Sequence, residues 1–440
     1  MALIELSTES PIPPAAAAPP PAYFYRRFGL ALAALLVLAL GGAAPVSSVL
    51  WWRIGAVPAS PSGDFQVTGG RIYTMDLDAD PRVLTAWQAD PVRRLWSIEA
   101  GGDEDPFFVG GGTADLVLVR EGRAVTVRDS STGAVRWASA VGVQQLTDTI
   151  GLIRQENFPP GTEYDPDSGD PGRLYGLNGS ALHTEPALST ELRGVDLASG
   201  RRIWSFTVPG SVFTAEPVTP GSGLLLLTTR KLALLSPETG AVLRERPVPR
   251  FGGPDPARGD IVDGMVLVNY GPFGTGGRVV AYDLGTLAER WRREQPDPAG
   301  NSANCYGPIC MVSRDEVTVL DPRTGADRWR ETDSDLLWFG PAAALEVQNL
   351  SAPLRTVSLD TGATRADLAG WSHYHAVYGR AAYILRRPEQ DGNGFGLLLP
   401  GRTAVQPLGR LPGVVEQCQP APTFLACQAG DHLEVWGYRG

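Results

Sequence analysis

A nine-residue frame that starts with Asp and ends with Trp is the feature that most constrains how this chain can fold. Complete copies occupy residues 129–137, 196–204, 283–291 and 321–329. In the last copy an alternating run, 316–320, precedes the Asp, and a period of two indicates a half-buried strand. Pro322 suits the second position of a tight turn, and Gly325 can adopt the positive φ that leads out of it. The frame therefore predicts a β-hairpin with a tryptophan on its second strand.

Partial copies extend the repeat to eight hairpins. They keep either the turn or the tryptophan, and they occupy residues 88–96, 236–244, 360–366 and 399–406. Most copies are spaced by about 40 residues, the period of four-stranded propeller blades. The turn glycines are Gly133, Gly200, Gly240, Gly325 and Gly362, and the tryptophans that we expect to pack between blades are Trp96, Trp137, Trp204, Trp291 and Trp329. Chance Thr-Gly pairs, the alternative, do not explain a constant Asp-to-Trp interval.

The repeat predicts an all-β fold, a β-propeller of four-stranded antiparallel blades. A single such sheet cannot cover its own faces, so each blade must stack on two neighbours and the series must close. We expect eight blades, with seven or nine as alternatives because the first and last copies are degenerate. Residues 414–438 supply inner strands of a further repeat, and the chain near 54–66 is the candidate strand to complete it and remove the exposed edge.

The succession of strand, Asp-x-x-Thr-Gly-x-x-x-Trp and strand resembles the repeat of PQQ-binding-like β-propellers. That superfamily includes quinoprotein alcohol dehydrogenases and the propeller lipoprotein of the outer-membrane barrel-assembly machinery. The resemblance covers residue 64 to the C-terminus and implies the architecture. It implies no particular activity, because the motif belongs to the scaffold.

Composition excludes one class of partner. The chain has 440 residues, of which 43% are hydrophobic and 20% charged, and its net charge is -10. No basic stripe is present to neutralise phosphates, so we expect no nucleic-acid partner. Long helical periodicity is missing after residue 52.

The N-terminal region predicts a membrane anchor. Residues 1–27 are rich in Pro and Ala and read as a disordered cytoplasmic tail. Residues 28–52 contain no charge and are long enough to cross a bilayer as one transmembrane helix. The arginine pair at 26–27 places the N-terminus in the cytoplasm and the rest of the chain outside. Residues 53–63 form a linker, and residues 64–440 form the propeller.

The alternative for the same segment is a cleaved signal peptide. Residues 28–40 would be its apolar region, with the cut near 41–44. Pro45 would then be the first mature residue, which disfavours cleavage, so we prefer the uncleaved anchor. A lipoprotein is not expected because the first cysteine is Cys305.

An insertion between Gln155 and Thr190 interrupts the repeat. Asp165, Asp167 and Asp170 bring three carboxylates together and are weak candidates for calcium. Their spacing departs from the helix-loop-helix calcium pattern, and a solvated loop is the preferred interpretation, so we expect no metal. Long loops in a compact domain often carry recognition, and this one is the predicted partner-binding feature.

The four cysteines fall into two pairs, each pair just before a strand at equivalent repeat positions. We predict the disulfides Cys305–Cys310 and Cys418–Cys427, which an extracellular location permits. Zinc is the alternative, but the pairs lie in different repeats and no histidine pattern accompanies them.

No catalytic set is visible in the sequence. The resemblance to quinoprotein dehydrogenases implies an adjacent Cys-Cys pair, and the chain has none. His373 and His375 share one strand face and could begin a metal site, although ordinary polar strand positions are preferred. The glycine-rich stretch 270–277 lacks the lysine of a phosphate loop.

We therefore expect no enzyme and no cofactor. The preferred function is a non-catalytic, membrane-anchored extracytoplasmic propeller that serves as a protein-interaction or ligand-recognition scaffold in the bacterial cell envelope. Its partner would be an unknown envelope protein or extracellular ligand. The alternative is an envelope oxidoreductase that depends on PQQ and calcium.

Overall fold

The computed structural model describes residues 50–439, with gaps at 62, 100–106, 171–173, 177–180, 218–222, 252–255, 263, 271–276, 296–304, 307–308, 313–315, 333, 341 and 378–379. The predicted tail, 1–27, and the predicted transmembrane segment up to residue 49 lie outside this part of the chain. Within it, no helix combines the length and the apolar character needed to cross a membrane.

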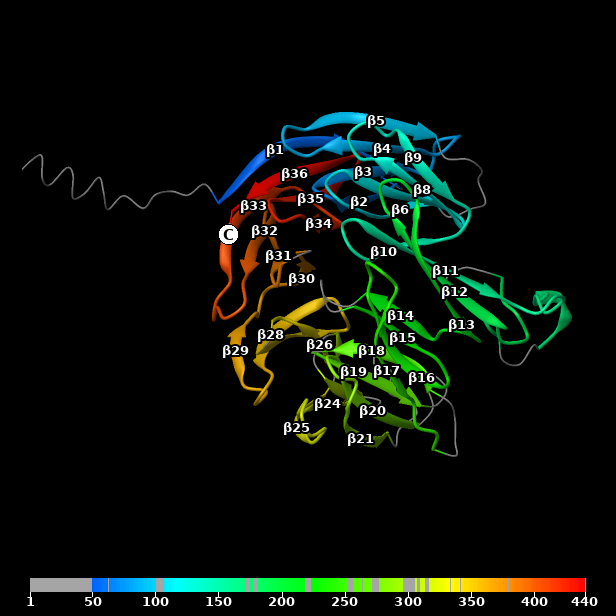
Figure 1. The fold of residues 1–440 in the computed structure, drawn as a ribbon. Helices are drawn as coiled ribbons and strands as arrows, with labels where there is room; N and C mark the ends of the chain where they lie inside the picture. The colour runs from blue at the N-terminus through cyan, green and yellow to red at the C-terminus, as the bar shows by residue number, and fades with distance from the viewer. Residues whose placement is uncertain are drawn as a thin grey trace, which may run out of the picture. The chain divides into compact units, whose positions relative to one another are not determined.

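Antiparallel sheets built from consecutive strands account for nearly all of the described structure (Figure 1). Blade 1 consists of β2 (Asp64–Thr68), β3 (Arg71–Asp76), β4 (Val83–Gln88) and β5 (Arg93–Glu99), and blade 2 of β6 (Phe107–Gly112), β7 (Leu116–Glu121), β8 (Ala124–Asp129) and β9 (Val135–Ser139). Blade 3 consists of β10 (Val143–Gln145), β11 (Ile150–Asn157), β12 (Ser189–Asp196) and β13 (Arg202–Pro209). Blade 4 consists of β14 (Thr214–Pro217), β15 (Leu224–Leu227), β16 (Lys231–Leu235) and β17 (Val242–Pro247).

The next three blades follow the same order along the chain. Blade 5 consists of β18 (Pro256–Val262), β19 (Met265–Tyr270), β20 (Gly277–Asp283) and β21 (Glu289–Gln295), and blade 6 of β23 (Cys310–Val312), β24 (Glu316–Leu320) and β25 (Asp327–Thr332). Blade 7 consists of β26 (Asp335–Trp338), β27 (Ala343–Gln348), β28 (Ala352–Ser358) and β29 (Thr364–Asp367). The short strand β22 (Cys305–Tyr306) pairs in parallel with β26 and so joins blade 7.

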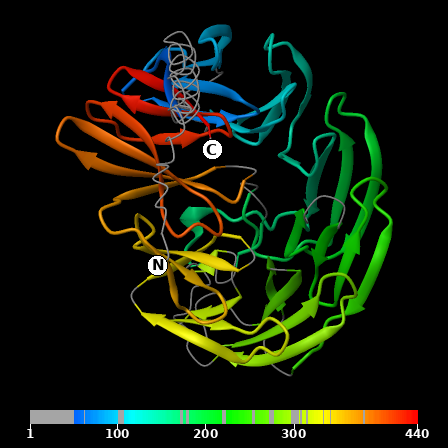
Figure 2. The same ribbon diagram turned by 90° about the vertical axis from the view of Figure 1, so that its left-hand side faces the viewer.

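The last two blades complete the fold. Blade 8 consists of β30 (His373–Ala376), β31 (Tyr383–Glu389), β32 (Gly392–Leu398) and β33 (Gln406–Pro412), and blade 9 of β34 (Cys418–Pro420), β35 (Phe424–Ala429), β36 (His432–Tyr438) and β1 (Trp51–Pro58). Figure 2 shows the blue strand β1 among the red C-terminal strands. The described strands thus form nine sheets, which confirms the all-β propeller and corrects the expected eight blades to nine.

The strand that completes blade 9 is β1, which overlaps the strand predicted near residues 54–66. Its register with β36 runs from Trp51 opposite Tyr438 to Pro58 opposite His432. The Trp51 ring stacks on Phe395 and on Trp436, with 5.3 Å between ring centroids in each pair. The last two residues of the predicted transmembrane segment, Trp51 and Trp52, therefore belong to a strand of blade 9, together with residues 53–58 of the expected linker. The propeller begins at Trp51 instead of residue 64.

Hydrophobic clusters fill the seams between neighbouring blades. Leu152 and Leu192 of blade 3 pack with Leu224 and Leu226 of blade 4 in one such cluster. Residues that point to opposite sides of one strand enter different seams, since Ile153 packs against blade 2 instead. The alternation that predicted half-buried strands thus describes strands that are covered on both sides by other blades.

The turn of the Asp-to-Trp frame has one geometry in each blade that keeps the glycine. Asp129 shows it: its carboxylate accepts from the amides of Ser131 and Thr132 at 3.0 and 2.9 Å. The Gly133 amide donates to the Asp129 carbonyl at 2.9 Å. The five turn glycines have φ from 67° to 74°, a region that side chains with a Cβ avoid.

Each frame tryptophan packs against the turn glycine of the following blade. A Cβ built on Gly325 would lie only 2.6 Å from the Trp291 ring, so the absent side chain makes room for the indole. The indole nitrogen also donates to the carbonyl three residues before that glycine. These bonds, 2.6–3.0 Å long, run from Trp96, Trp137, Trp204, Trp291 and Trp329 to Ser130, Leu197, Pro237, Pro322 and Leu359.

The seam between blades 4 and 5 departs from this rule on both sides. Arg244 occupies the tryptophan position of blade 4, since it pairs with Leu234 as Trp204 pairs with Gly194. Leu287 occupies the glycine position of blade 5 and adopts φ 53°. Its side chain is buried in the seam cluster with Leu232 and Leu234. A leucine from one blade thus occupies the seam that an indole fills elsewhere.

Candidate functional site

A cavity of about 320 Å³ lies where blades 2 and 3 meet the insertion. Blade 2 contributes Arg120 at the end of β7 and Arg123 in the turn to β8, and β10 contributes Gln144. Arg154 and Glu156 come from β11. β10 and β11 pair within blade 3, and the stacking of blade 2 on blade 3 brings the blade 2 arginines to them.

The insertion itself covers residues 158–188, because β11 continues to Asn157 and β12 begins at Ser189. It leaves the propeller at the ends of these two strands (Figure 1). The predicted boundaries, Gln155 and Thr190, therefore fall inside strands.

Aromatic and polar contacts hold the insertion against the cavity. The Phe158 ring stacks on the His183 imidazole, with 3.8 Å between centroids and 7° between planes. The Thr162 hydroxyl lies 3.0 Å from His183 Nδ1, and the backbones of His183 and Tyr175 exchange two hydrogen bonds. Phe158, Glu163 and His183 all line the cavity, so the insertion forms one of its walls.

The wall of the cavity contains more arginines than carboxylates, in a chain whose net charge is -10. Three arginines line it, together with the carboxylates of Glu156 and Glu163. Gly142 lets one guanidinium approach the backbone, because a Cβ there would lie 3.1 Å from Arg120 Nη2. Side chains of both charges thus face one cavity.

Two acceptors in the cavity wall lack donors. Among the described residues, Gln144 Oε1 and Glu156 Oε2 are buried and have no hydrogen-bond partner. Burial raises the pKa of the Glu156 carboxyl, and the hydrogen bond with Ser211 and the charge of Arg154 offset part of that effect. Buried polar atoms usually have partners, so these two could accept hydrogen bonds from a group that enters the cavity.

The weak calcium candidates lie in the insertion and do not converge. Asp165 Oδ1 accepts from the amide of Asp167 at 3.0 Å and caps the 3-10 helix Pro166–Ser168. In the part of the chain that the structure describes, no three His, Cys, Asp or Glu residues are grouped to hold a metal. Asp167 and Asp170 are exposed. The Asp165 carboxylate, a weak calcium-ligand candidate in the sequence, thus stabilises a local turn.

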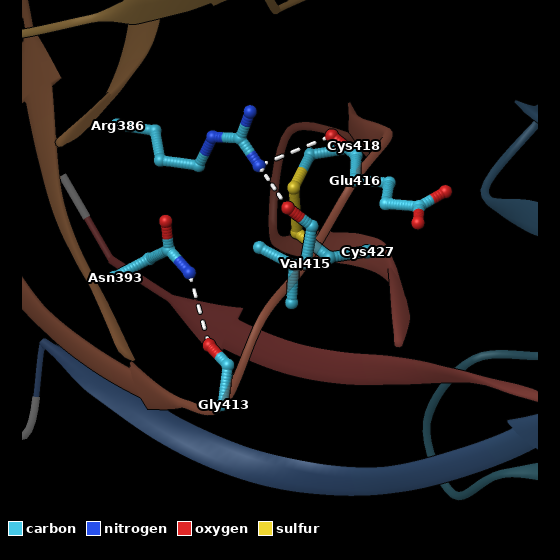
Figure 3. Close-up of a disulfide and its surroundings, with 7 residues drawn as sticks. All are labelled: Arg386, Asn393, Gly413, Val415, Glu416, Cys418 and Cys427. Atoms are coloured by element: carbon cyan, nitrogen blue, oxygen red, sulfur yellow. Dashed lines mark hydrogen bonds between the residues drawn. A yellow bond between two sulfur atoms is a disulfide. The ribbon is translucent and has the colours of Figure 1, made fainter. Parts of the chain in front are cut away.

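The predicted histidine pair, His373 and His375, lies in blade 8 beside a buried arginine. His375 is packed on the face that also carries His373 and Arg386, and burial, then the charge of Arg386, lower its pKa to about 4. Arg386 donates to the carbonyls of Val415 and Glu416 at 2.5 and 3.1 Å (Figure 3). This arginine joins blade 8 to the chain that leads into blade 9, a structural role.

One predicted disulfide is present. Cys418 and Cys427 face each other across β34 and β35, with 4.0 Å between their Cα atoms (Figure 3). Cys310 is also disulfide-bonded, but the side chain of Cys305 lies outside the described residues, so the Cys305–Cys310 pairing stays a prediction.

A second, more open hollow of about 530 Å³ lies along blade 8. Its charged groups are already engaged: Glu389 forms ion pairs with Arg387 and Arg410, and Arg387 lies over the Trp371 ring. The basic cavity, which the insertion helps to line, is the stronger candidate site because the repeat itself does not require that insertion. Sequence reasoning missed it, because Arg120 and Arg123 look like ordinary turn residues and nothing in the sequence pairs them with β11.

Comparison with known proteins gives a family match over part of the chain. Residues 189–335 match the family model described as outer membrane protein assembly factor BamB, of the PQQ-like repeat. No curated protein matches the chain.

Solved structures with similar folds have low sequence identity. BamB from Moraxella catarrhalis is 13% identical, covers 88% of this chain and 100% of its own, and has a TM-score of 0.40. Sqt1 from Saccharomyces cerevisiae is 9% identical, with coverages of 82% and 98% and a TM-score of 0.42. A eukaryotic initiation factor is 10% identical, with coverages of 85% and 94% and a TM-score of 0.49.

Proposed function

We propose, on the premise that this chain belongs to the PQQ-like β-propeller repeat family, that it is a non-catalytic scaffold that binds a protein partner in the bacterial cell envelope. The family match extends over residues 189–335 and carries the name of an outer membrane assembly factor, which supports an envelope role. The frame tryptophans are packed between blades and hydrogen-bonded there. The repeat therefore stabilises the fold, and we expect other residues to bind the partner.

The insertion over the basic cavity is the observation that carries the proposal. Three arginines and two buried acceptors without donors meet there, beside a loop of 158–188 that the repeat does not need. Residues placed this way have no role in closing the propeller. We assign them to recognition of the partner.

The proposal includes a location. Residues 28–50, the part of the predicted transmembrane segment that precedes β1, cross the cytoplasmic membrane once, with the N-terminus inside and the propeller outside, an orientation that the arginines at 26–27 favour. The Cys418–Cys427 disulfide fits an oxidising compartment.

Reporter fusions test this topology. Alkaline phosphatase is active only outside the cytoplasm, so a fusion after residue 63 should be active and the same fusion without residues 28–50 should be inactive. Activity of the second fusion would show that residues 28–50 are not what carries the reporter across the membrane. Inactivity of both, with both fusions stably made, would contradict an extracytoplasmic propeller.

Proximity labelling in the native host tests the scaffold role. Asn157 and Ser189 lie opposite each other in the β11–β12 register, so a two-residue Asn-Gly turn can replace residues 158–188. This variant should keep the circular dichroism and thermal midpoint of the parent chain and lose its reproducibly labelled partner. An unchanged set of labelled proteins would show that the insertion does not recruit the partner.

A further inference from the structure

We infer that one face of the propeller, the face that carries the frame turns, rests on anionic lipid headgroups at blades 8, 9 and 1, so that the insertion and its cavity face away from the membrane. The inference deepens the proposed function and rests on its membrane segment. Three features support it: the direction of the strands, the missing linker before β1 and a group of arginines near Trp52.

The direction of the strands places the insertion and the start of β1 on opposite faces. Strands alternate in direction within a blade, so the turn between the third and fourth strands lies opposite to the turn between the second and third. The frame turns are of the first kind, and β1 starts on their face as the fourth strand of blade 9. The insertion joins β11 to β12, the second and third strands of blade 3. We call the two sides the turn face and the insertion face.

The packing of Trp51 agrees with this assignment. Gly409 pairs with Phe395 just before the register shift of blade 8, the place that the frame tryptophans occupy in their blades. A Cβ built on Gly409 would lie 2.4 Å from Trp51 Cδ1. Trp51 thus contacts the tryptophan position of the preceding blade, as the turn glycines do elsewhere, and lies at the level of the frame turns.

The chain passes from the proposed membrane segment, 28–50, directly into β1, which begins at Trp51. A helix of residues 28–50 would be about 34 Å long, and the hydrocarbon core of a bilayer is about 30 Å thick. The headgroup layer adds about 5 to 7 Å on each side, so Trp51 emerges at or within that layer. Without a spacer, the turn face around Trp51 must lie next to the headgroups.

Exposed arginines lie on the turn face around this point. Arg439 follows β36, and its guanidinium carbon is 5.5 Å from the centroid of the Trp52 ring. Arg402 lies in the turn before β33, and Arg94 lies at the start of β5. Among the described residues, no carboxylate forms an ion pair with any of the three. Guanidinium groups bind phosphates, and arginine and tryptophan are typical of protein surfaces at a membrane interface.

The turn face is less basic in the blades farther from β1. Asp129, Asp283 and Asp321 lie on it in blades 2, 5 and 6, and each forms an ion pair with an arginine of its own hairpin. These pairs leave little net charge to attract an anionic surface. The contact therefore belongs to blades 8, 9 and 1, where the chain enters the propeller.

Lipid photo-crosslinking on the full-length chain, reconstituted in vesicles of phosphatidylglycerol and phosphatidylcholine, tests the orientation. A crosslinking residue replaces Thr403, which is exposed in the turn before β33, or Val414, which is exposed at the opposite end of blade 8. Mass spectrometry should find about tenfold more lipid adduct from position 403 than from position 414, because only the first lies on the turn face.

Two further arms test the role of charge. Vesicles of phosphatidylcholine alone should lower the adduct yield at 403 by about threefold, since their surface has no net charge. Arg402→Glu/Arg439→Glu should lower it by a similar factor in the mixed vesicles. Arg230→Glu/Arg250→Glu is the matched control: it reverses two exposed arginines on the insertion face of blade 4 and should leave the yield unchanged.

Several results would overturn the inference. A yield from 403 no greater than that from 414 would contradict the orientation. A yield at 403 that survives either the change of lipid or Arg402→Glu/Arg439→Glu, or that falls equally in the control variant, would contradict the electrostatic contact. If the phosphatase fusion after residue 63 is active, such a result leaves the proposed location intact and removes only the membrane contact. An inactive fusion shows instead that the proposed membrane segment is wrong.

Discussion

At the scale of single residues, the glycine and the tryptophan of the frame act as partners that belong to different blades. Gly325 turns the chain with φ 69°, and its missing Cβ is the space that Trp291 fills. The indole N–H is satisfied by the Pro322 carbonyl at 3.0 Å, so a large aromatic is buried without an orphan donor. In the sequence, the glycine and the tryptophan belong to one frame. In the structure, the glycine contacts the tryptophan of the preceding copy, and the tryptophan contacts the glycine of the following copy.

Gly325→Ala tests this partnership. The substitution forces alanine into positive φ, at a cost of about 1 to 3 kcal/mol, and drives its Cβ into the Trp291 ring. Gly430 is the matched control, because its φ is 67° and no atom lies within 4 Å of its added Cβ. The urea unfolding free energy should fall more for Gly325→Ala than for Gly430→Ala. Equal losses would mean that the indole contact does not constrain the glycine.

The turn carboxylates make acid stability a second test at this scale. Hydrogen bonds from Thr286, then from Arg290, lower the pKa of Asp283 to about 2, below the value of about 3.9 expected in the unfolded chain. A depressed folded-state pKa contributes stability above the unfolded pKa, and this contribution is lost as pH falls through the folded pKa.

Thermal midpoints between pH 5 and pH 2 measure the effect. The loss of stability on acidification should be smaller for Asp283→Asn than for the parent, because the variant lacks this carboxylate. Asp148→Asn, which removes an exposed carboxylate from the loop before β11, should follow the parent. Identical acid profiles for the parent and Asp283→Asn would refute a role for the turn carboxylate.

At the scale of elements, strands and turns follow from local sequence, and their exceptions follow from neighbouring blades. The hairpins were predictable because alternation, turn chemistry and tryptophan all agree within nine residues. The exception at Leu287 was not, since positive φ is unfavourable for leucine and only the seam explains it. Where Arg244 replaces the indole, the leucine of the next turn supplies apolar volume instead.

A double-mutant cycle at Arg244 and Leu287 tests this compensation. Leu287→Gly relieves about 1 to 2 kcal/mol of backbone strain but removes a buried leucine, which costs about 2 to 5 kcal/mol. Arg244→Trp alone places an indole where the leucine already lies. The pair Arg244→Trp/Leu287→Gly recreates the common seam and should be more stable than the single effects predict, by about 0.5 to 3 kcal/mol. Additive effects in urea unfolding would contradict compensation.

At the scale of the whole molecule, β1 closes the propeller by pairing with β36 from the far end of the chain. The closing blade was anticipated from the strands near the C-terminus, but its last strand was partly hidden in an uncharged run that reads as membrane-spanning. As aromatic residues, Trp51 and Trp52 suit either the end of a transmembrane segment or a β-strand. Their pairing with Tyr438 and Gly437 assigns them to the strand.

Truncation tests the closing strand. A chain that begins at Leu50 retains β1 and should unfold cooperatively, whereas a chain that begins at Gly63 leaves the β36 edge unpaired. Val57, fully buried in the seam between blades 9 and 1, is also lost. We expect the shorter chain to aggregate or to unfold at a much lower temperature, by thermal scanning and size exclusion. Equal midpoints would show that β1 is dispensable.

The candidate site illustrates what a sequence of repeats conceals. The insertion was recognisable because it breaks the spacing, and so was its interest as a binding feature. The cavity was not, because Arg120, Gln144 and Arg154 come from separate strands of two blades and meet only through stacking. Local sequence patterns specify a single blade, whereas the side chains that meet in a seam come from two blades.

Photo-crosslinking in the native host tests the central claim most directly, that a partner binds where the insertion covers the basic cavity. A crosslinking residue replaces Glu163, an exposed member of the cavity wall, or Val414, which is 83% exposed in the segment before blade 9. The account predicts a discrete protein adduct from position 163, none from 414, and loss of the adduct in the Arg120→Glu/Arg154→Glu background. Equal adducts from both positions, or an adduct from 163 that survives the charge reversal, would contradict it.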